Sequence, residues 1–295
     1  MLFRSFRFVA GDADSSSETR LLRTAAQRSL RPEIRRRAAA LASAPDSAFS
    51  LHPDGCLHWR DALVAQLQQG PSARAPRLVL LGSDLLDGAP RIDVEKRLNA
   101  WLATHLARAL APLDRLNAHG LNGAARGIAF QLNESLGMLS RPQVAEQISN
   151  LSHSERKALR GRGVQFGSHA IFVPALLKAR ATATRAQLWA VHHNLSPLPA
   201  PLPMGRVSVD VDPERPLGYY FAAGYLVFGT RAIRVDMVER LAATMANRAR
   251  KGPVPLAAEL WALVGCNRDS FEDVLLGIGF RRHDTDAGPT FVPVR

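Results

Sequence analysis

A proline-rich stretch between residues 195 and 218 limits how the chain can fold. Proline lacks the backbone N–H that an α-helix needs, and its ring clashes with the preceding helical turn. This stretch therefore cannot lie inside a helix, and we expect an ordered or semi-rigid connector between two parts of the chain. The six prolines are Pro197, Pro199, Pro201, Pro203, Pro213 and Pro216.

The sequence after the connector predicts a small module over residues 219–295. A strand-like segment comes first, then three short helices, and finally a β-hairpin. Phe271 and Leu275 fall on the inner face of the last helix, so we expect them in the core. Three helices followed by a hairpin is the order of a winged helix-turn-helix. The segments are a strand over 225–235, helices beginning at Asp236, Pro255 and Asn267, and strands over 280–283 and 290–294.

Before the connector, the pattern predicts a small β element followed by helices. Apolar and polar residues alternate around the turn-forming residues 52–55, which is typical of a β-hairpin. Strands over 63–67 and 78–81, separated by Gly70-Pro71, extend this element. We expect four regions: an Arg-rich helical segment at 1–48, a β-hairpin plus helical domain at 49–194, the connector, and the module at 219–295. The predicted fold class is α+β, predominantly α.

Helix signals are clear in the middle region. We expect Asp93 to cap a helix with an apolar stripe at i, i+4, i+7 and i+8, in which Leu98 and Trp101 are core residues. Ser152 and Glu155 have the spacing of a capping box, in which each residue satisfies a backbone N–H near the other. The full stripe is Val94, Leu98, Trp101, Leu102, Leu106 and Leu110.

The chain is strongly basic, with a formal net charge of +12. A charge of this sign and size suits a polyanionic partner, because each phosphate contact releases a counterion. A second interpretation stays open. Nearly all basic residues are arginines, a bias typical of a GC-rich genome, so the charge also fits a basic protein kept soluble by it. The lysines are Lys96, Lys157, Lys178 and Lys251.

Cysteine content and hydropathy point to the cytoplasm. The chain has only two cysteines, Cys56 and Cys266, far apart in sequence, which excludes a disulfide framework. No apolar run approaches the roughly 18 residues that a membrane span needs, so we expect no membrane partner. The abrupt start at Met1 leads us to expect the cut edge of a longer reading frame.

Motifs for catalysis and metal binding are missing from the sequence. It contains no G-x-x-x-x-G-K-[ST] loop to hold nucleotide phosphates. His52, Cys56 and His58 lie close together, but a fourth zinc ligand is not visible, and surface positions on a hairpin account for them. We therefore predict no catalytic residue, no metal site and no cofactor within this chain.

Basic residues concentrate at two places that could bind phosphates. One is the helix that begins after Ser152, and the other is the C-terminal hairpin. One feature argues against phosphate binding at the C-terminal hairpin. The third helix of the module carries three acidic residues near its start that would repel phosphate: Asp269, Glu272 and Asp273. The predicted nucleic-acid-binding residues are Arg156, Lys157, Arg160, Arg162, Lys178, Arg281 and Arg282.

Several ordered strings resemble one known family. They include Ala-Arg-Gly-Ile-Ala-Phe-Gln-Leu-Asn-Glu-Ser-Leu-Gly at 125–137, Gly-Val-Gln-Phe-Gly at 163–167, Phe-Val-Pro-Ala-Leu-Leu-Lys at 172–178, Arg-Val-Asp-Met-Val-Glu-Arg-Leu at 234–241 and Phe-Glu-Asp-Val-Leu-Leu at 271–276. Over residues 49–283 they are similar to the C-terminal, non-motor region of alphaproteobacterial superfamily 2 helicases related to the mitochondrial degradosome RNA helicase.

The resemblance implies an accessory region that contacts nucleic acid in an ATP-dependent helicase. In that family, two RecA-like domains bind ATP and magnesium, and none of their motor residues has a counterpart here. The implied partners are those motor domains and a single strand, RNA slightly before DNA. The alternative is a free-standing winged-helix regulator or protein-interaction adaptor. The sequence leaves open whether the parent protein unwinds or remodels its substrate.

Overall fold

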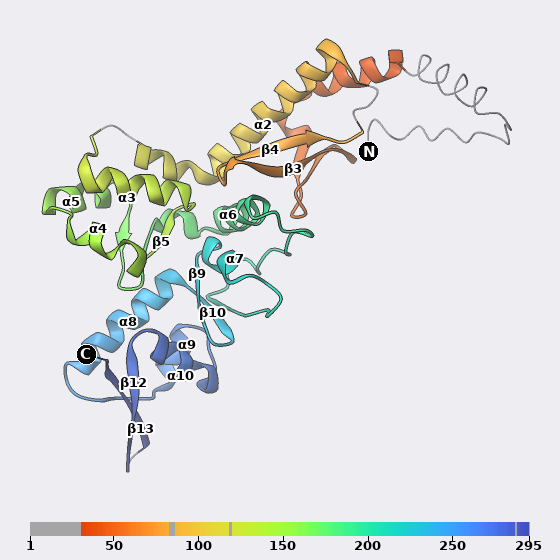
Figure 1. The fold of residues 1–295 in the computed structure, drawn as a ribbon. Helices are drawn as coiled ribbons and strands as arrows, with labels where there is room; N and C mark the ends of the chain where they lie inside the picture. Colours follow the sequence, from red (N-terminus) through yellow and green to blue (C-terminus); the bar gives the residue numbers. More distant parts are fainter. Residues whose placement is uncertain (1–30, 83–85, 118–119, 287, 295) are drawn as a thin grey trace. The chain divides into compact units, whose positions relative to one another are not determined.

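The computed structural model describes residues 31–82, 86–117, 120–286 and 288–294 (Figure 1). Within them the chain is α+β and predominantly helical, with four small antiparallel sheets, so the predicted fold class is confirmed. Of the Arg-rich segment expected at 1–48, residues 1–30 lie outside the described part and residues 31–42 are helical. None of the described helices combines the length and apolar character needed to cross a bilayer.

The chain divides into two compact units. Of the described residues, those up to Arg108 and those in 191–200 form the first unit, and those in 109–190 and from 201 onward form the second. The domain boundaries expected from the sequence stay predictions.

A four-stranded sheet in the order β1-β2-β3-β4 forms the β part of the first unit. The predicted hairpin is present, with Phe49 opposite Trp59 and residues 52–55 in the turn. Gly70 and Pro71 lie within β3 and not between two strands, which corrects the expectation. The pairing of β3 with β4 is irregular there, and such an irregularity accommodates a residue without an N–H. The strands are β1 (Phe49–Leu51), β2 (Cys56–Trp59), β3 (Ala62–Ser72) and β4 (Ala75–Leu80), preceded by the 3-10 turn η1 (Asp46–Ala48).

Helix α2 (Gly88–Asp114) carries the predicted apolar stripe, and all six of its members are buried. The helix begins earlier than expected, so Asp93 lies inside it and does not cap it. Pro90 falls in the first turn, where its missing N–H costs nothing because that group has no partner in a helix. In the first unit, the Trp101 indole N–H donates to the carbonyl of Asp46 at 3.0 Å. A 3-10 turn, η3 (Arg115–Asn117), follows α2.

The second unit begins with helices around a small sheet in the order β5-β7-β6. The predicted capping box is confirmed: Ser152 accepts from the Glu155 N–H, and Glu155 accepts from the Ser152 N–H. The elements are α3 (Gly123–Glu134), β5 (Met138–Ser140), η4 (Pro142–Val144), α4 (Ala145–Ser149), α5 (His153–Gly161), β6 (Gln165–Phe166), β7 (Ala170–Phe172), η5 (Pro174–Leu177) and α6 (Ala179–His192).

Part of the proline-rich stretch is regular structure. Its residues Ser208–Asp210 form strand β8, which pairs with β10, and helix α7 (Leu217–Ala222) begins at its end. The segment expected as one strand is a hairpin of β9 (Tyr225–Phe228) and β10 (Arg231–Arg234). Gly229 makes its turn with φ of 53°, and a Cβ there would collide with the Asp273 carboxylate.

The C-terminal elements follow the predicted order, with one added strand. Pro255 lies in β11 opposite Thr290, so the second helix begins at Ala258 and not at Pro255. Arg234 is the N-cap of the first helix, and Asp236 lies in its first turn. Asn267 caps the third helix as predicted, accepting from the Ser270 N–H. The elements are α8 (Val235–Ala249), β11 (Val254–Pro255), α9 (Ala258–Leu263), α10 (Arg268–Gly277), β12 (Phe280–Thr285) and β13 (Gly288–Pro293), with sheet order β11-β13-β12.

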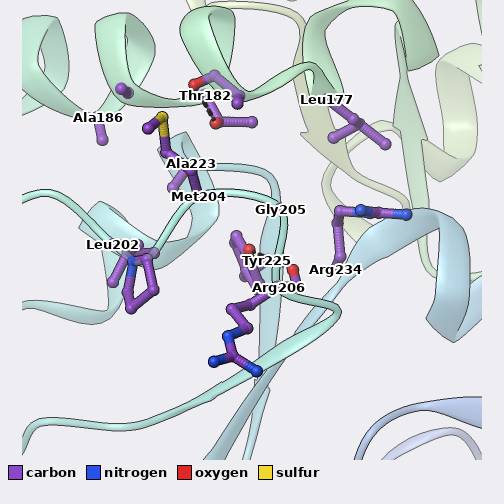
Figure 2. A pocket seen from close by; sticks show the side chains of 13 residues that line it. Leu177, Thr182, Ala186, Leu202, Met204, Gly205, Arg206, Ala223, Tyr225 and Arg234 are labelled. Carbon is purple, nitrogen blue, oxygen red and sulfur yellow. Dashed lines mark hydrogen bonds between the residues drawn. The ribbon is translucent and has the colours of Figure 1, made fainter.

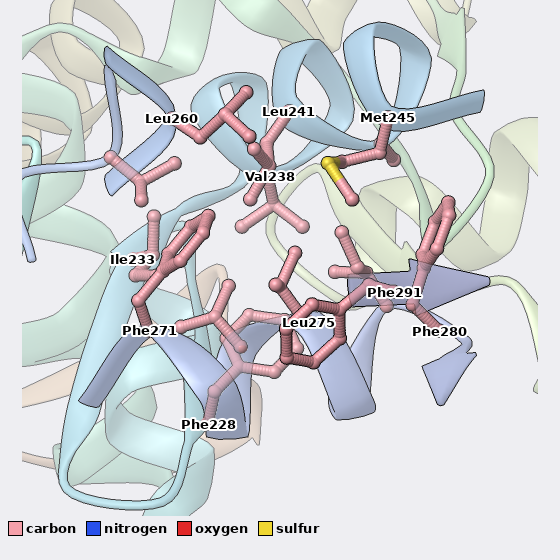
Figure 3. Close-up of a cluster of buried hydrophobic side chains, with 14 of the residues drawn as sticks. Phe228, Ile233, Val238, Leu241, Met245, Leu260, Phe271, Leu275, Phe280 and Phe291 are labelled. Atoms are coloured by element: carbon pink, nitrogen blue, oxygen red, sulfur yellow. The ribbon is translucent and has the colours of Figure 1, made fainter. Parts of the chain in front are cut away.

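One buried apolar cluster holds this C-terminal module together (Figure 3). Phe271 and Leu275 of α10 point into it, and both are essentially inaccessible to solvent, as the sequence predicted. Val238, Leu241 and Met245 reach the cluster from α8. Because the helices and the hairpin share this core, the hairpin β12–β13 and α8 are fixed relative to each other.

Candidate nucleic-acid interface

Four of the predicted phosphate-binding residues lie on α5 or directly after it, and the structure shows that they are of two kinds. The apolar anchor of α5 is Leu159, which is fully buried, and this orients the rest of the helix. Lys157 and Arg160 are exposed. Arg156 and Arg162 are half-buried and donate to backbone carbonyls: Arg156 Nη2 to Ile148 at 2.6 Å, and Arg162 Nη1 to Ala158 at 3.1 Å.

The Arg156 contact has a structural purpose. The carbonyl groups of the last turn of a helix lack partners within that helix, and a cation stabilises them. Ile148 lies in the last turn of α4, so Arg156 ties the end of α4 to α5. Lys157 and Arg160 are therefore the α5 cations that are available to a ligand.

The turn after α5 brings an aromatic ring to Arg160. Gly163 has φ of 88°, a conformation that favours glycine, and lets the chain leave the helix sharply. Strand β6 then places Phe166 so that the Arg160 guanidinium lies over its ring, 5.7 Å from the centroid. The cation therefore lies over one face of the aromatic ring. Single-strand-binding proteins use this pairing of groups for phosphates and bases.

Lys178 is exposed where η5 ends and α6 begins. Its backbone carbonyl accepts from the Thr182 N–H, so its main chain belongs to the start of α6. Within the described residues, no hydrogen bond or ion pair joins its side chain to α5.

The two arginines predicted on the C-terminal hairpin, β12–β13, differ in their surroundings. Arg281 is exposed on β12. Arg282 pairs with Asp284 at 2.8 Å and with Glu272 of α10 at 3.1 Å, and hydrogen bonds with these carboxylates raise its pKa. One of the three acidic residues on α10, Glu272, is therefore paired with Arg282 of β12, while Asp269 and Asp273 stay exposed.

Arginines paired with nearby carboxylates are common in the C-terminal half of the second unit. Each pair joins residues of this half, so these cations are already partly neutralised before any ligand arrives. The pairs are Arg231–Asp210, Arg234–Asp236, Arg248–Glu259 and Arg282–Glu272.

A buried carboxylate, Glu239 of α8, holds the β6–β7 turn. Only 9% of Glu239 is exposed. It accepts from the backbone N–H groups of Ser168 (2.6 Å), His169 (2.8 Å) and Ala170 (3.1 Å), and from the Ser168 hydroxyl (2.7 Å). Burial alone would raise its pKa, but the hydrogen bonds from His169 and Ser168 outweigh burial and lower the pKa from 4.5 to about 2.

Gly167 makes this arrangement possible. A Cβ at this position would lie 2.3 Å from the Glu239 carboxyl group, so only glycine lets the turn close over it. This cluster was not predictable from the sequence. The only local signal is a Gly-Ser-His run, and its partner is about seventy residues away.

Ser168, His169 and Glu239 together have the residue types of a hydrolytic triad, but their geometry differs from one. A triad needs the imidazole between the hydroxyl and the carboxylate, so that it can take the hydroxyl proton. Here a single imidazole nitrogen, His169 Nδ1, lies 2.9 Å from the Ser168 hydroxyl and 3.7 Å from Glu239, and the hydroxyl itself lies 2.7 Å from Glu239 and donates to it, so the ring does not bridge the two groups. The carboxylate therefore orients the turn, and we assign the cluster a structural role.

Two further features are packing sites. Burial lowers the pKa of the Arg185 guanidinium to about 10, but only 1% of Arg185 is exposed, so a ligand cannot reach it in the folded protein. A small pocket between α6 and the segment at 202–206 is lined by Tyr225 and Arg234 among others (Figure 2). Its volume of about 20 Å³ is roughly that of one water probe, so it is too small for a substrate.

The hairpin histidines stack on each other. The His52 and His58 rings are 4.1 Å apart and nearly parallel, and burial raises the pKa of the nearby Cys56 thiol. Over the part of the chain that the structure describes, no group of three or more metal-ligating side chains is found.

Comparisons with protein-family models, curated proteins and solved structures find no match to this chain.

Proposed function

We propose that this chain is the non-catalytic, C-terminal accessory region of an ATP-dependent superfamily 2 helicase, and that it binds single-stranded nucleic acid, RNA before DNA. The observation that carries the proposal is the exposed pair Lys157 and Arg160 on α5, with Phe166 beside Arg160. Cations that contact phosphates give sequence-independent affinity, and an aromatic ring adds stacking with any base.

The C-terminal elements support the same proposal. Helix α8, strand β11, helices α9 and α10, and the hairpin β12–β13 follow one another in the order of a winged helix. A winged helix that reads DNA bases places the start of its last helix in the major groove. Asp269 and Asp273 are exposed there and oppose phosphate, which favours an accessory role over the alternative of a free-standing regulator.

Under this proposal, ATP and magnesium bind the RecA-like motor domains of the parent protein. This chain would add affinity for the nucleic-acid strand on which those motor domains act. The family resemblance of residues 49–283 is the basis for this part of the proposal.

The purified chain is expected to show no nucleic-acid-stimulated ATP hydrolysis. The sequence lacks the loop that holds nucleotide phosphates, so nothing here positions the γ-phosphate for attack. The measurement is phosphate release from Mg-ATP with and without oligo(U), across the fractions of a size-exclusion column. Stimulated turnover that follows the protein peak would contradict the proposal.

Reversing the charge of both exposed α5 cations, with Lys157→Glu and Arg160→Glu, is expected to weaken binding to all single strands alike. Each lost phosphate contact should reduce the slope of log affinity against log salt by roughly 0.7. Fluorescence anisotropy with labelled oligo(U) and oligo(dT) at several salt concentrations measures both effects. Arg156 is not used, because its reversal would break the contact with α4.

The matched control is Arg35→Glu with Lys96→Glu. These are an exposed arginine and an exposed lysine on helices of the first unit, so the control changes net charge by the same amount. It should leave the affinity nearly unchanged. Equal losses in both double variants would mean that binding follows net charge alone, as expected for a protein whose basicity reflects genome composition.

A further inference from the structure

A groove of about 730 Å³ lies within the second unit, beside the basic helix. One wall is the β6–β7 turn, the second is the outer face of α8, and the third is the base of the wing at the start of β12. Ligand sites typically occupy about 300–1,000 Å³. The groove is therefore large enough for part of an extended ligand.

The residues that line the groove are of the types that contact flat, stacked groups. Phe166 contributes an aromatic ring from β6, and Ile278 at the end of α10 and Phe280 at the start of β12 also line the groove. On α8, Ala243 and Ala246 are exposed and lack long side chains, so a planar group can approach the helix closely.

Positive charge flanks the groove at two points. Arg160 lies over Phe166 at one wall, and Arg250 at the end of α8 lines another and is exposed. The acidic side chain among the lining residues is Glu239, and its carboxylate oxygens are occupied by hydrogen bonds from the β6–β7 turn. A phosphate backbone therefore meets cations at the rim and no exposed carboxylate among the residues that line the groove.

We propose that single-stranded nucleic acid lies in this groove, with a base stacked on Phe166 and phosphates at Arg160 and Arg250. This inference rests on the proposed function and names its binding path. Glu239 and Gly167 act as positioning residues, because they fix the turn that carries Phe166.

The test uses the whole chain and a fluorescein-labelled oligo(U) of about 12 nucleotides, within the site sizes known for single-strand binders. Phe166→Leu removes the aromatic face but keeps apolar packing. It is expected to weaken binding by about 5-fold or more, since a stacked base contributes strongly to affinity, with the salt slope unchanged because no phosphate contact is lost. Phe166→Tyr should retain the affinity.

Ala246→Trp fills the groove and is expected to weaken oligo(U) binding as strongly as Phe166→Leu does. Two controls separate stacking in the groove from general surface effects. Phe130→Leu changes an aromatic ring on α3 that is 65% exposed and does not line the groove, and Ala100→Trp adds a ring on an exposed face of α2 in the first unit. Both should bind oligo(U) like the unmodified chain. Circular dichroism and melting temperature verify that each variant is folded.

The outcomes distinguish this inference from the proposed function. If the unmodified chain binds oligo(U), and folded Phe166→Leu and Ala246→Trp bind it equally well, the groove is not the path and the inference is wrong, while the function stands. If the unmodified chain binds neither oligo(U) nor oligo(dT), both the inference and the proposed function are wrong.

Discussion

Replacing Phe271 with alanine is expected to lower the free energy of unfolding of the second unit by about 3–5 kcal/mol. Phe271 is 0% exposed and belongs to the cluster that joins α8, α9, α10 and the hairpin β12–β13. Its ring lies 6.2 Å from that of Trp261 in an edge-on arrangement. Alanine would leave a cavity among the helices and the hairpin, which rigid packing fills only in part.

Urea unfolding followed by circular dichroism measures this loss. Leu276→Ala on the same helix is the control, because the Leu276 side chain is 49% exposed and contributes little to the core. A change within about 0.5 kcal/mol is expected for it. Equal midpoints for Phe271→Ala and the unmodified chain would mean that the face of α10 is wrongly assigned.

Replacing Glu239 with glutamine is expected to cost about 2–3 kcal/mol at neutral pH and almost nothing at low pH. The pKa of Glu239 is about 2 in the folded chain, against 4.5 ordinarily. The folded state therefore favours the ionised form. This contribution to stability is fully present above about pH 4.5 and is lost as the pH falls toward about 2.

Urea unfolding of the two proteins at pH 7 and pH 3 tests this dependence. The difference in unfolding free energy should shrink as the pH falls, because the glutamine side chain does not titrate. Glu134→Gln, an exposed residue on α3 of the same unit, is the control and should give no large difference at either pH. A difference for Glu239→Gln that stays constant between the two pH values would contradict the assignment.

Elements set by local chemistry were predictable from the sequence. The capping box at Ser152 and the Asn267 cap depend on residues three positions apart, and both are present. The apolar stripe of α2 depends only on helical periodicity, and it is buried as predicted.

Elements that depend on distant partners were not predictable. The local sequence predicts Pro255 as the first residue of a helix, but pairing with Thr290 places it in a strand. Strand β8 forms inside the proline-rich stretch because β10 offers an unpaired edge. In both cases, pairing with a strand distant in sequence outweighs the local sequence pattern. Hydrophobic periodicity contains no information about such pairing.

The same limit applies to the candidate site. A cluster of arginines in the sequence does not reveal which guanidinium groups are occupied within the fold. Arg156, Arg162 and Arg282 bond to carbonyls or carboxylates, while Lys157, Arg160 and Arg281 remain exposed. The groove was also not predictable from the sequence, because the Glu239 cluster that shapes it joins residues about seventy positions apart.

The pairing of arginines with carboxylates in the C-terminal half bears on how long a strand would stay bound. The net charge of +12 already counts the acidic residues, but it does not show that four arginines, Arg231, Arg234, Arg248 and Arg282, have acidic partners within the fold. If the chain binds single strands as proposed, these four paired side chains would release fewer counterions than unpaired cations do, so a strand would dissociate faster than the number of basic residues suggests. In the proposed helicase, a shorter residence time would let the strand advance without this accessory region holding it against the motor domains.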